Sequence, residues 1–155
     1  MAISREVLAK IPAFDPELGP GALGLGEETL FSMQLKEAGY RIAGAFEVEV
    51  EHHFDEKRLE AESRLEIART LGAVDAYLAY HWKHAKWSRP RLRLLRAWIL
   101  WALCRASGRK GKGVSERLLW VTRSVHACLQ YLREEVRPRN YEKHGLARLR
   151  QESGR

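Results

Sequence analysis

Hydrophobic side chains recur at helical spacing over most of this chain. From Glu27 to Ala38, apolar residues lie three or four positions apart, and Gly39 follows where a helix would end. The same period runs from Glu56 to about Lys86, from Leu92 to Cys104 and from Val114 to Leu132. These patterns predict a helix in each segment.

The segment from Glu56 to Lys86 is the longest of these predicted helices. Its candidate core residues, read from the helical period, are Leu59, Ile67, Leu71, Val74 and Leu78. Gly72 stands in the middle as a candidate break, because glycine weakens a helix interior. A further short helix is expected over Met1–Lys10.

Two segments depart from the helical pattern. The first, from Ile11 to Gly26, contains three prolines and four glycines, which predict a long loop of the kind that often carries function. In the second, from Tyr40 to His52, Val48 and Val50 alternate with glutamates, the period of a half-buried strand. The residues therefore predict a fold that is mainly α with a short β element.

The composition, 45% hydrophobic and 30% charged, is that of a folded protein. Cys104 and Cys128 lie far apart without metal-finger spacing, so we expect reduced, buried thiols. The N-terminus shows no signal-peptide pattern, and no stretch reaches the roughly 18–20 apolar residues of a membrane span. A cytoplasmic location is therefore expected.

Charge divides the chain into an acidic front and a basic rear. Residues 1–80 hold 8 Lys or Arg against 15 Asp or Glu, a net charge of −7, and residues 81–155 hold 19 against 5, a net charge of +14. We therefore expect two surfaces with different partners.

A paired carboxylate, Glu27-Glu28, opens the predicted helix directly after the glycine-rich loop. One interpretation is structural, because acids in the first turn stabilise a helix by roughly 0.3–1 kcal/mol each. The other is general-base catalysis, because a loop-to-helix junction can present a carboxylate to a cleft, where it accepts a proton. The residues alone leave both interpretations open.

Four short motifs surround this pair. They are Phe14–Gly21 (FDPELGPG), Gly26–Glu28 (GEE), Ala38–Ile42 (AGYRI) and Val50–His52 (VEH). Their order and spacing resemble the acceptor-side half of family-2 glycosyltransferases with the GT-A fold, whose motifs read roughly FDE-x-L-G-x-G, G-E-D, A-G-Y-R-I and V-x-H. The resemblance covers residues 2–86, and Glu28 stands where the family usually has Asp.

The resemblance implies the C-terminal part of an α/β, Rossmann-like GT-A enzyme over residues 1–87, followed by a basic helical extension over residues 88–155. The half that binds the nucleotide sugar, with its D-x-D motif, is not found in this sequence. We therefore expect a mainly helical fragment that is inactive alone. In the complete enzyme, Glu28 would be the catalytic base and Glu27 its electrostatic or acceptor-binding neighbour.

Two histidines, His52 and His53, end the predicted strand. A histidine at a strand end is commonly a surface residue. In the family that the chain resembles, a histidine at the place of His52 completes the site of a divalent metal, Mn or Mg, that bridges the donor diphosphate. Mn²⁺ accepts both nitrogen and oxygen ligands. A separate zinc site formed by His52, His53, His81 and His84 is an alternative.

Aromatic, imidazole and ammonium groups alternate from His81 to Trp87 (HWKHAKW). This segment is either a helix end whose cations favour the helix dipole or a platform for sugar and phosphate, because Trp faces stack on sugar rings. Trp82 and His53 are the candidate substrate-binding residues.

The basic rear alternates arginines with Leu and Trp from Ser88 to Cys104, and a linker, Gly108–Gly113 (GRKGKG), follows. The pattern fits an amphipathic segment on an anionic membrane surface, with Trp98 and Trp101 inserted. The alternative is core packing with the arginines extended to solvent. No nucleic-acid recognition motif is present, so no nucleic-acid partner is expected. The polar tail after Pro138 is expected to fray.

Two functions are therefore expected as competing hypotheses. The first is transfer of a sugar from a nucleotide-sugar donor to a glycan or lipid-linked acceptor, peripheral to the inner membrane face. The second is a non-catalytic helical module that binds an anionic membrane surface or a partner chain.

Overall fold

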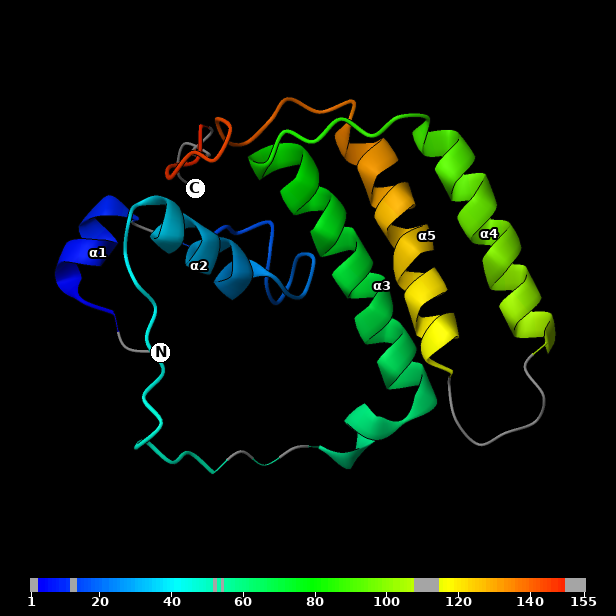
Figure 1. The fold of residues 1–155 in the computed structure, drawn as a ribbon, viewed down its shortest axis with the longest axis horizontal. Coiled ribbons are helices and arrows are strands. Elements are labelled where there is room, and N and C mark those ends of the chain that lie inside the picture. The colour runs from blue at the N-terminus through cyan, green and yellow to red at the C-terminus, as the bar shows by residue number, and fades with distance from the viewer. Residues whose placement is uncertain (1–2, 12–13, 52, 54, 108–114, 150–155) are drawn as a thin grey trace.

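The structure is a computed structural model that describes residues 3–11, 14–51, 53, 55–107 and 115–149, and it is mainly helical (Figure 1). Its elements are α1 (Arg5–Lys10), α2 (Glu27–Glu37), the 3₁₀ turn η1 (Glu56–Leu59), α3 (Ala61–Tyr77), the π-helical turn η2 (Leu78–Trp82), α4 (Pro90–Ser107) and α5 (Glu116–Glu134). Within the described ranges, no helix is long and apolar enough to cross a membrane.

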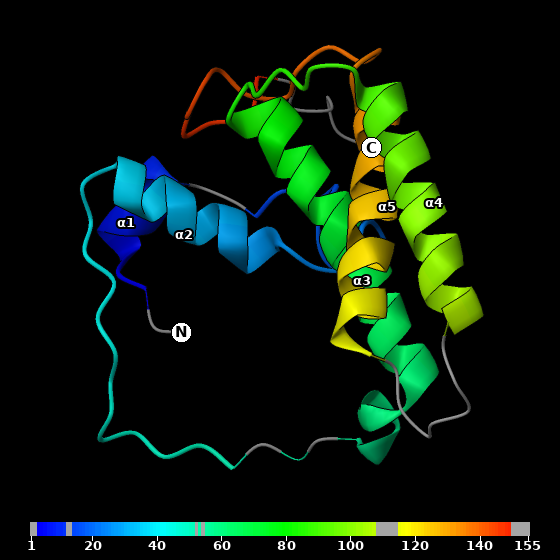
Figure 2. The ribbon, with the colours of Figure 1, turned by 45° about the vertical axis from the view of Figure 1, so that its right-hand side comes forward.

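Helices α3, α5 and α4 lie side by side in that order (Figures 1 and 2). Helices α3 and α5 approach closely at Gly72, where a Cβ atom would lie 2.2 Å from the carbonyl oxygen of Arg123. The predicted break at Gly72 is therefore wrong. The helix runs through this residue unbroken, and the missing side chain lets the two backbones meet.

Helix α3 is the central element because two of its faces are covered. Toward α5, Ala76 of α3 and Tyr80 of the following turn η2 pack on Ala127 and Tyr131. The opposite side joins the largest apolar cluster, whose buried members are Leu18, Leu30, Val74, Tyr77, Leu78, Trp82 and Tyr141. Helix α3 thus connects the loop and α2 to the helices of the rear half, across the expected division at residues 87 and 88.

The core positions predicted on α3 are only partly correct. Val74 and Leu78 are buried, whereas Leu59 is 79% exposed and Ile67 is 41% exposed. Leu59 belongs to η1, because the α-helix begins only at Ala61. The helix ends at Trp82 through η2, in which the N–H of Lys83 donates to the carbonyl of Leu78 at 3.0 Å.

The predicted strand over residues 40–52 does not form, and no strand occurs among the described residues. The segment is irregular, with a turn at Phe46-Glu47 in which the N–H of Val48 donates to the carbonyl of Ala45 at 3.1 Å. It is also exposed, with Phe46 at 96%, Val48 at 61% and Val50 at 79%. Alternation produces a strand only where a neighbouring strand accepts its hydrogen bonds, and no described segment lies in that position. The β part of the predicted fold class is therefore wrong for this structure. His52 lies outside the described residues.

The expected fraying of the C-terminal tail is wrong over residues 138–149. Asn140 and Tyr141 are buried, and the N–H of Leu149 donates to the carbonyl of Asn140 at 2.7 Å. The indole N–H of Trp82 donates to the carbonyl of Gly145 at 2.9 Å. These contacts fold the tail over the C-terminal end of α3, which a polar composition does not predict.

Both cysteines are free, as expected. Burial is confirmed for Cys128 on α5, whereas Cys104 on α4 is only partly buried. The predicted linker over residues 108–113 lies outside the described residues.

Candidate functional site

The loop from Phe14 to Gly26 is built around an aspartate and several glycines. Asp15 Oδ1 accepts a hydrogen bond from the backbone N–H of Glu17 at 3.0 Å, which closes the first turn. The N–H of Gly24 then donates to the carbonyl of Gly19 at 2.6 Å. Four glycines have φ between 75° and 103°, a region that other residues rarely enter: Gly19, Gly21, Gly24 and Gly26.

Two of these glycines determine how the loop enters α2. Gly26 precedes the helix with φ 103°, and a Cβ atom there would lie 2.5 Å from Val74 Cγ1 on α3. A Cβ atom on Gly19 would lie 3.0 Å from the carboxyl carbon of Glu27. The loop therefore passes close over Glu27 and against α3 immediately before α2 begins.

The paired carboxylates differ in their surroundings. Glu27 is half-buried beneath Gly19, whereas Glu28 is exposed on the first turn of α2. Within the part of the chain that the structure describes, the Glu28 carboxylate has no hydrogen-bond or ion-pair partner. Glu28 is thus the member of the pair that another molecule can reach.

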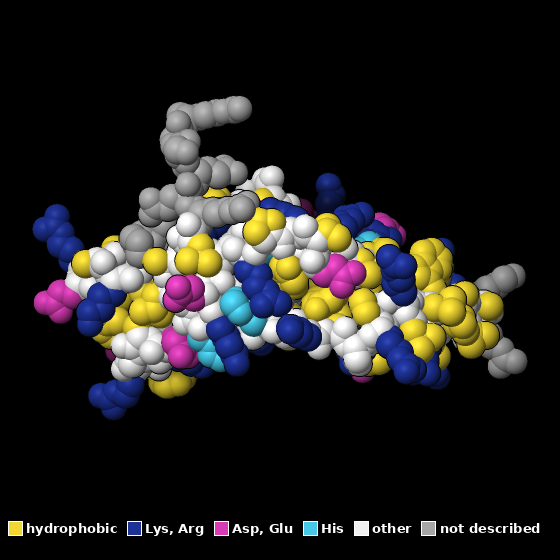
Figure 3. Space-filling model, turned by 90° about the horizontal axis from the view of Figure 1, so that it is seen from above, with side chains coloured by type: hydrophobic (Ala, Val, Ile, Leu, Met, Phe, Trp, Pro, Cys, Tyr) yellow, Lys and Arg dark blue, Asp and Glu magenta, His cyan; other side chains and the backbone are white. Residues whose placement is uncertain are grey.

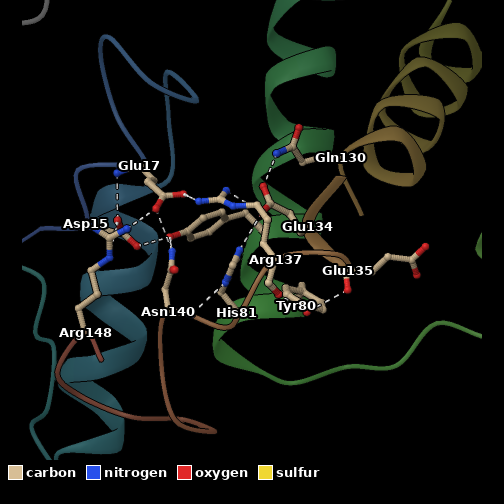
Figure 4. Close-up of polar contacts among 11 residues, drawn as sticks. Asp15, Glu17, Tyr80, His81, Gln130, Glu134, Glu135, Arg137, Asn140 and Arg148 are labelled. Carbon is tan, nitrogen blue, oxygen red and sulfur yellow. Dashed lines mark hydrogen bonds and ion pairs between the residues drawn. The ribbon is translucent and has the colours of Figure 1, made fainter. Parts of the chain in front are cut away.

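A buried polar network lies beneath the loop (Figure 4). Asp15, only 4% exposed, accepts through Oδ2 from the hydroxyls of Tyr77 at 2.6 Å and Tyr141 at 2.8 Å. Burial, together with the negative charge of Asp15, raises the pKa of both tyrosines well above the usual value. Both hydroxyls therefore stay protonated and act as donors to the carboxylate.

Glu17 extends this network toward the C-terminal segment. Its carboxylate receives hydrogen bonds from Arg137 Nη2 at 3.0 Å, from Asn140 Nδ2 at 3.1 Å and from Arg148. The amide of Asn140 also donates to the hydroxyl of Tyr77 at 2.7 Å. Both acids of the first loop motif are thus held by residues more than a hundred positions away.

His81 is fully buried, and its hydrogen bonds fix its tautomer. Nδ1 accepts from the backbone N–H of Asn140 at 3.1 Å, so the ring proton is on Nε2, which donates to Glu134 Oε2 at 2.9 Å. The rings of Tyr77 and Tyr80 pack against it, with centroids at 4.5 Å and 4.9 Å.

Glu134, at the end of α5, is buried, and several hydrogen-bond donors compensate its carboxylate for the loss of water. It also accepts from Gln130 and, at 2.9 Å, from Arg137 Nη1. Burial alone would raise its pKa, but the hydrogen bonds from His81 and Gln130 and the charge of Arg137 outweigh burial and lower that pKa. Glu134 is therefore an ionised acceptor.

A His–Glu pair can serve general-base chemistry, but this pair is enclosed. His81 is 0% exposed and Glu134 is 1% exposed, and both ring nitrogens of His81 are engaged inside the protein. A reacting group must come within hydrogen-bond reach of a catalytic base. The pair therefore positions Asn140 and η2, and the accessible carboxylate of this region is Glu28.

The segment that leads to His53 does not return toward Glu28 (Figures 1 and 2). The segment from Tyr40 to Glu51 leaves α2 and runs away from it (Figures 1 and 2). His53 is exposed, and its ion pair is with Glu51 at 3.4 Å.

Trp82 is 5% exposed, and one ring face stacks on His144 at a centroid distance of 4.8 Å. Trp98 and Trp101 lie on α4, with ring centroids 5.5 Å apart.

The described residues form no metal site of their own. Among them, no group of three or more His, Cys, Asp or Glu side chains could hold a metal ion. The alternative zinc site is not assembled by its described members, because His81 is bound to Glu134 and Nε2 of His84 lies 2.9 Å from the carbonyl of Tyr141. The role of His52 as a ligand stays a prediction.

The sequence interpretation missed most of the buried network. Its members outside the first loop motif are Tyr77, His81, Gln130, Glu134, Arg137, Asn140, Tyr141 and Arg148. One usable signal was Tyr141, the aromatic residue of a tail that is mostly polar. Comparisons with protein-family models, curated proteins and solved structures found no match.

Proposed function

We propose that this chain supplies the acceptor-side part of a family-2 glycosyltransferase, with Glu28 as the catalytic base. The observation that carries the proposal is the position of Glu28. Its carboxylate is exposed at a loop-to-helix junction and has no partner among the described residues, while the loop beneath is anchored by Asp15 and Glu17.

The proposed chemistry is a single displacement with inversion. The acceptor hydroxyl oxygen attacks the anomeric carbon, the bond from that carbon to the diphosphate oxygen breaks, and the hydroxyl proton passes to Glu28. Anchoring favours this role, because a base must be held within hydrogen-bond reach of the acceptor. Glu27, half-buried beside it, would orient the acceptor or stabilise developing positive charge.

The donor would be bound elsewhere. This sequence contains no D-x-D triplet, so we propose that the nucleotide sugar and its Mn or Mg ion are held mainly by a part of the enzyme outside these 155 residues, with His52 as the ligand that this chain would contribute. A divalent ion there would neutralise the leaving diphosphate. Among the described residues, no group of side chains could hold such an ion. The described residues of this chain therefore take part only in binding the acceptor and removing its proton.

The exposed segment from Tyr40 to Glu51 supports the proposal that another part of the enzyme packs against this chain. Val48 and Val50 alternate with glutamates, yet all lie in solvent and no described strand pairs with them. Such a segment would gain hydrogen bonds and apolar burial by adding to the sheet of a donor-binding half. We further propose a glycan or lipid-linked acceptor, reached from the cytoplasmic side of the inner membrane.

A chimera tests this proposal. The donor-binding half of a family-2 glycosyltransferase of known specificity would precede this chain, and transfer would be measured with nucleotide sugar and Mn²⁺. We expect metal-dependent transfer by the chimera and none by the 155-residue chain alone. Glu28→Gln should lower turnover by roughly 10²–10⁴-fold with donor affinity unchanged.

The adjacent carboxylate provides the matched control. Glu27→Gln changes the same charge one residue away and should cost less turnover than Glu28→Gln. The opposite order would assign the base to Glu27. Turnover by the isolated chain would contradict the need for another half. A chimera that binds donor but transfers nothing would favour the alternative, a non-catalytic helical module, for which the exposed apolar side of α4 is the supporting observation.

A further inference from the structure

We propose that α4 is a docking surface for an anionic lipid bilayer. Its outer face, defined here by Leu92, Leu95, Trp98, Ile99 and Leu103, would enter the bilayer interface, and the flanking arginines would meet lipid phosphates. This inference rests on α4 and its neighbours and is independent of the proposed transfer reaction.

The packing of α4 determines which side faces outward. Residues three or four positions apart turn toward α5, and they are buried or half-buried: Leu94, Ala97, Trp101 and Cys104. On the opposite side Leu95 is 56% exposed, Ile99 51% and Leu103 59%. A surface helix normally has polar side chains there, so this apolar stripe requires a cover.

Arginines border the outer face on both sides. Arg91, Trp98 and Arg105 are spaced seven residues apart and therefore lie along one edge of the helix. Arg93 and Arg96 lie along the other edge and line a pocket between α4 and α5. Within the described ranges, none of these four arginines forms an ion pair. Long basic side chains beside an apolar stripe suit a lipid interface, where they reach the phosphates while the stripe is buried.

The sequence in and beside α4 carries charged side chains of positive sign only, over a long stretch. Residues 76–115 contain no Asp or Glu, and their basic residues are Lys83, Lys86, Arg89, Arg91, Arg93, Arg96, Arg105, Arg109, Lys110 and Lys112. Figure 3 shows apolar side chains gathered at the right-hand end, with Lys and Arg beside them. A lipid bilayer with anionic headgroups and an apolar interior complements this combination of basic and apolar side chains.

The pocket continues the apolar surface from α4 onto α5. It has a volume of about 380 Å³, and its lining includes Leu100, Trp120 and Cys128 in addition to Arg93 and Arg96. Trp120, at the rim, is 64% exposed. An apolar slot with two arginines suits one acyl chain of an anionic lipid whose phosphate stays at the arginines.

Other occupants fit less well. A second copy would bring the same unpaired arginines against each other without a carboxylate on this stretch to neutralise them. A nucleic acid would satisfy the arginines but would leave Leu95, Ile99 and Leu103 without an apolar partner.

Vesicle co-sedimentation tests the proposal with the whole 155-residue chain. Phosphatidylcholine vesicles are compared with equimolar phosphatidylcholine and phosphatidylglycerol, and binding is expected only to the latter. The triple variant Arg91→Gln, Arg96→Gln, Arg105→Gln should bind roughly a hundredfold more weakly, because each arginine contributes roughly fivefold. The pair Ile99→Gln, Leu103→Gln should lose at least roughly tenfold without any change in charge.

The matched control is Arg5→Gln, Arg58→Gln, Arg64→Gln, which removes the same net charge from exposed positions away from α4. It should retain most of the binding, and circular dichroism should show equal helix content in all variants. Equal losses in the two triple variants, unchanged binding of the Ile99 and Leu103 pair, or no binding to anionic vesicles would each overturn the proposal. A dimer that the Ile99 and Leu103 pair dissociates would assign the face to a second copy instead.

Discussion

The hydroxyl of Tyr77 on α3 donates a 2.6 Å hydrogen bond to the carboxylate of Asp15, 62 positions earlier in the chain. The same hydroxyl accepts a 2.7 Å hydrogen bond from the amide of Asn140. One atom of α3 thus connects the loop in front of Glu28 to the C-terminal segment.

Tyr77→Phe should therefore destabilise the protein by about 1–3 kcal/mol, because it leaves the buried carboxylate of Asp15 and the amide of Asn140 each without one partner. Urea unfolding followed by circular dichroism measures the change. Tyr40→Phe is the control, since the Tyr40 hydroxyl has no hydrogen-bond partner among the described residues. Equal effects of the two substitutions would show that the buried hydroxyl contributes nothing specific.

Alkaline pH should weaken the same contacts. Burial and the charge of Asp15 raise the pKa of Tyr77 and Tyr141 above the usual value of about 10. Above about pH 10 the unfolded chain releases these protons while the folded protein keeps them, so stability falls as pH rises. The fall should approach about 1.4 kcal/mol per pH unit for each tyrosine. Unfolding free energies measured across that range should show a shallower slope in Tyr77→Phe.

Acid pH should destabilise the protein by protonating Glu134. Its pKa is lowered because the hydrogen bonds from His81 and Gln130 and the charge of Arg137 outweigh the effect of burial, so its contribution is present at neutral pH and lost as pH falls through the lowered pKa. Glu134→Gln should cost roughly 2 kcal/mol or more at neutral pH, where charged hydrogen bonds are lost. In urea unfolding, the difference in unfolding free energy from wild type should begin to narrow below about pH 4, where the unfolded carboxylate binds a proton, and should vanish once the pH falls through the lowered pKa of the native carboxylate.

The neighbouring residue supplies a control for that substitution. Glu135 is exposed, and its side chain forms no hydrogen bond with any described residue. Glu135→Gln should therefore leave the unfolding free energy nearly unchanged at both pH values. If the difference in unfolding free energy between wild type and Glu134→Gln stays the same at acid pH, the ionised carboxylate is not the stabilising species.

The helices were predictable because their signal is local. Apolar residues at helical spacing indicated α2, α3, α4 and α5. The observed ends of α2, α4 and α5 lie within three residues of the prediction, whereas α3 begins five residues later and ends nine residues earlier than predicted. The segment of Val48 and Val50 was predicted wrongly, because alternation specifies which side of a strand is apolar but not whether a partner strand exists.

The buried network was not predictable by the same means. Asp15, Asn140 and the pair Tyr77 and His81 are polar residues from three separate segments, and nothing in their local sequence indicates that they meet. Gly72 was misinterpreted for the same reason, since only the approach of α5 shows why a side chain is excluded there. The position of Glu28 at a loop-to-helix junction was predictable, because glycines and helical period are both local signals.

The entry of the loop into α2 should depend on Gly26 more than on Gly21. Both have positive φ, 103° and 87°, so alanine at either position should cost roughly 1–2 kcal/mol of backbone strain. At Gly21 a Cβ atom meets nothing within 4 Å, whereas at Gly26 it would lie 2.5 Å from Val74 Cγ1. Gly26→Ala should therefore lower the unfolding free energy further, and Val74→Ala should recover only the steric part of that excess. Equal losses of unfolding free energy at the two glycines would show that Val74 on α3 moves aside at little cost. The position of Glu28 would then not depend on this contact.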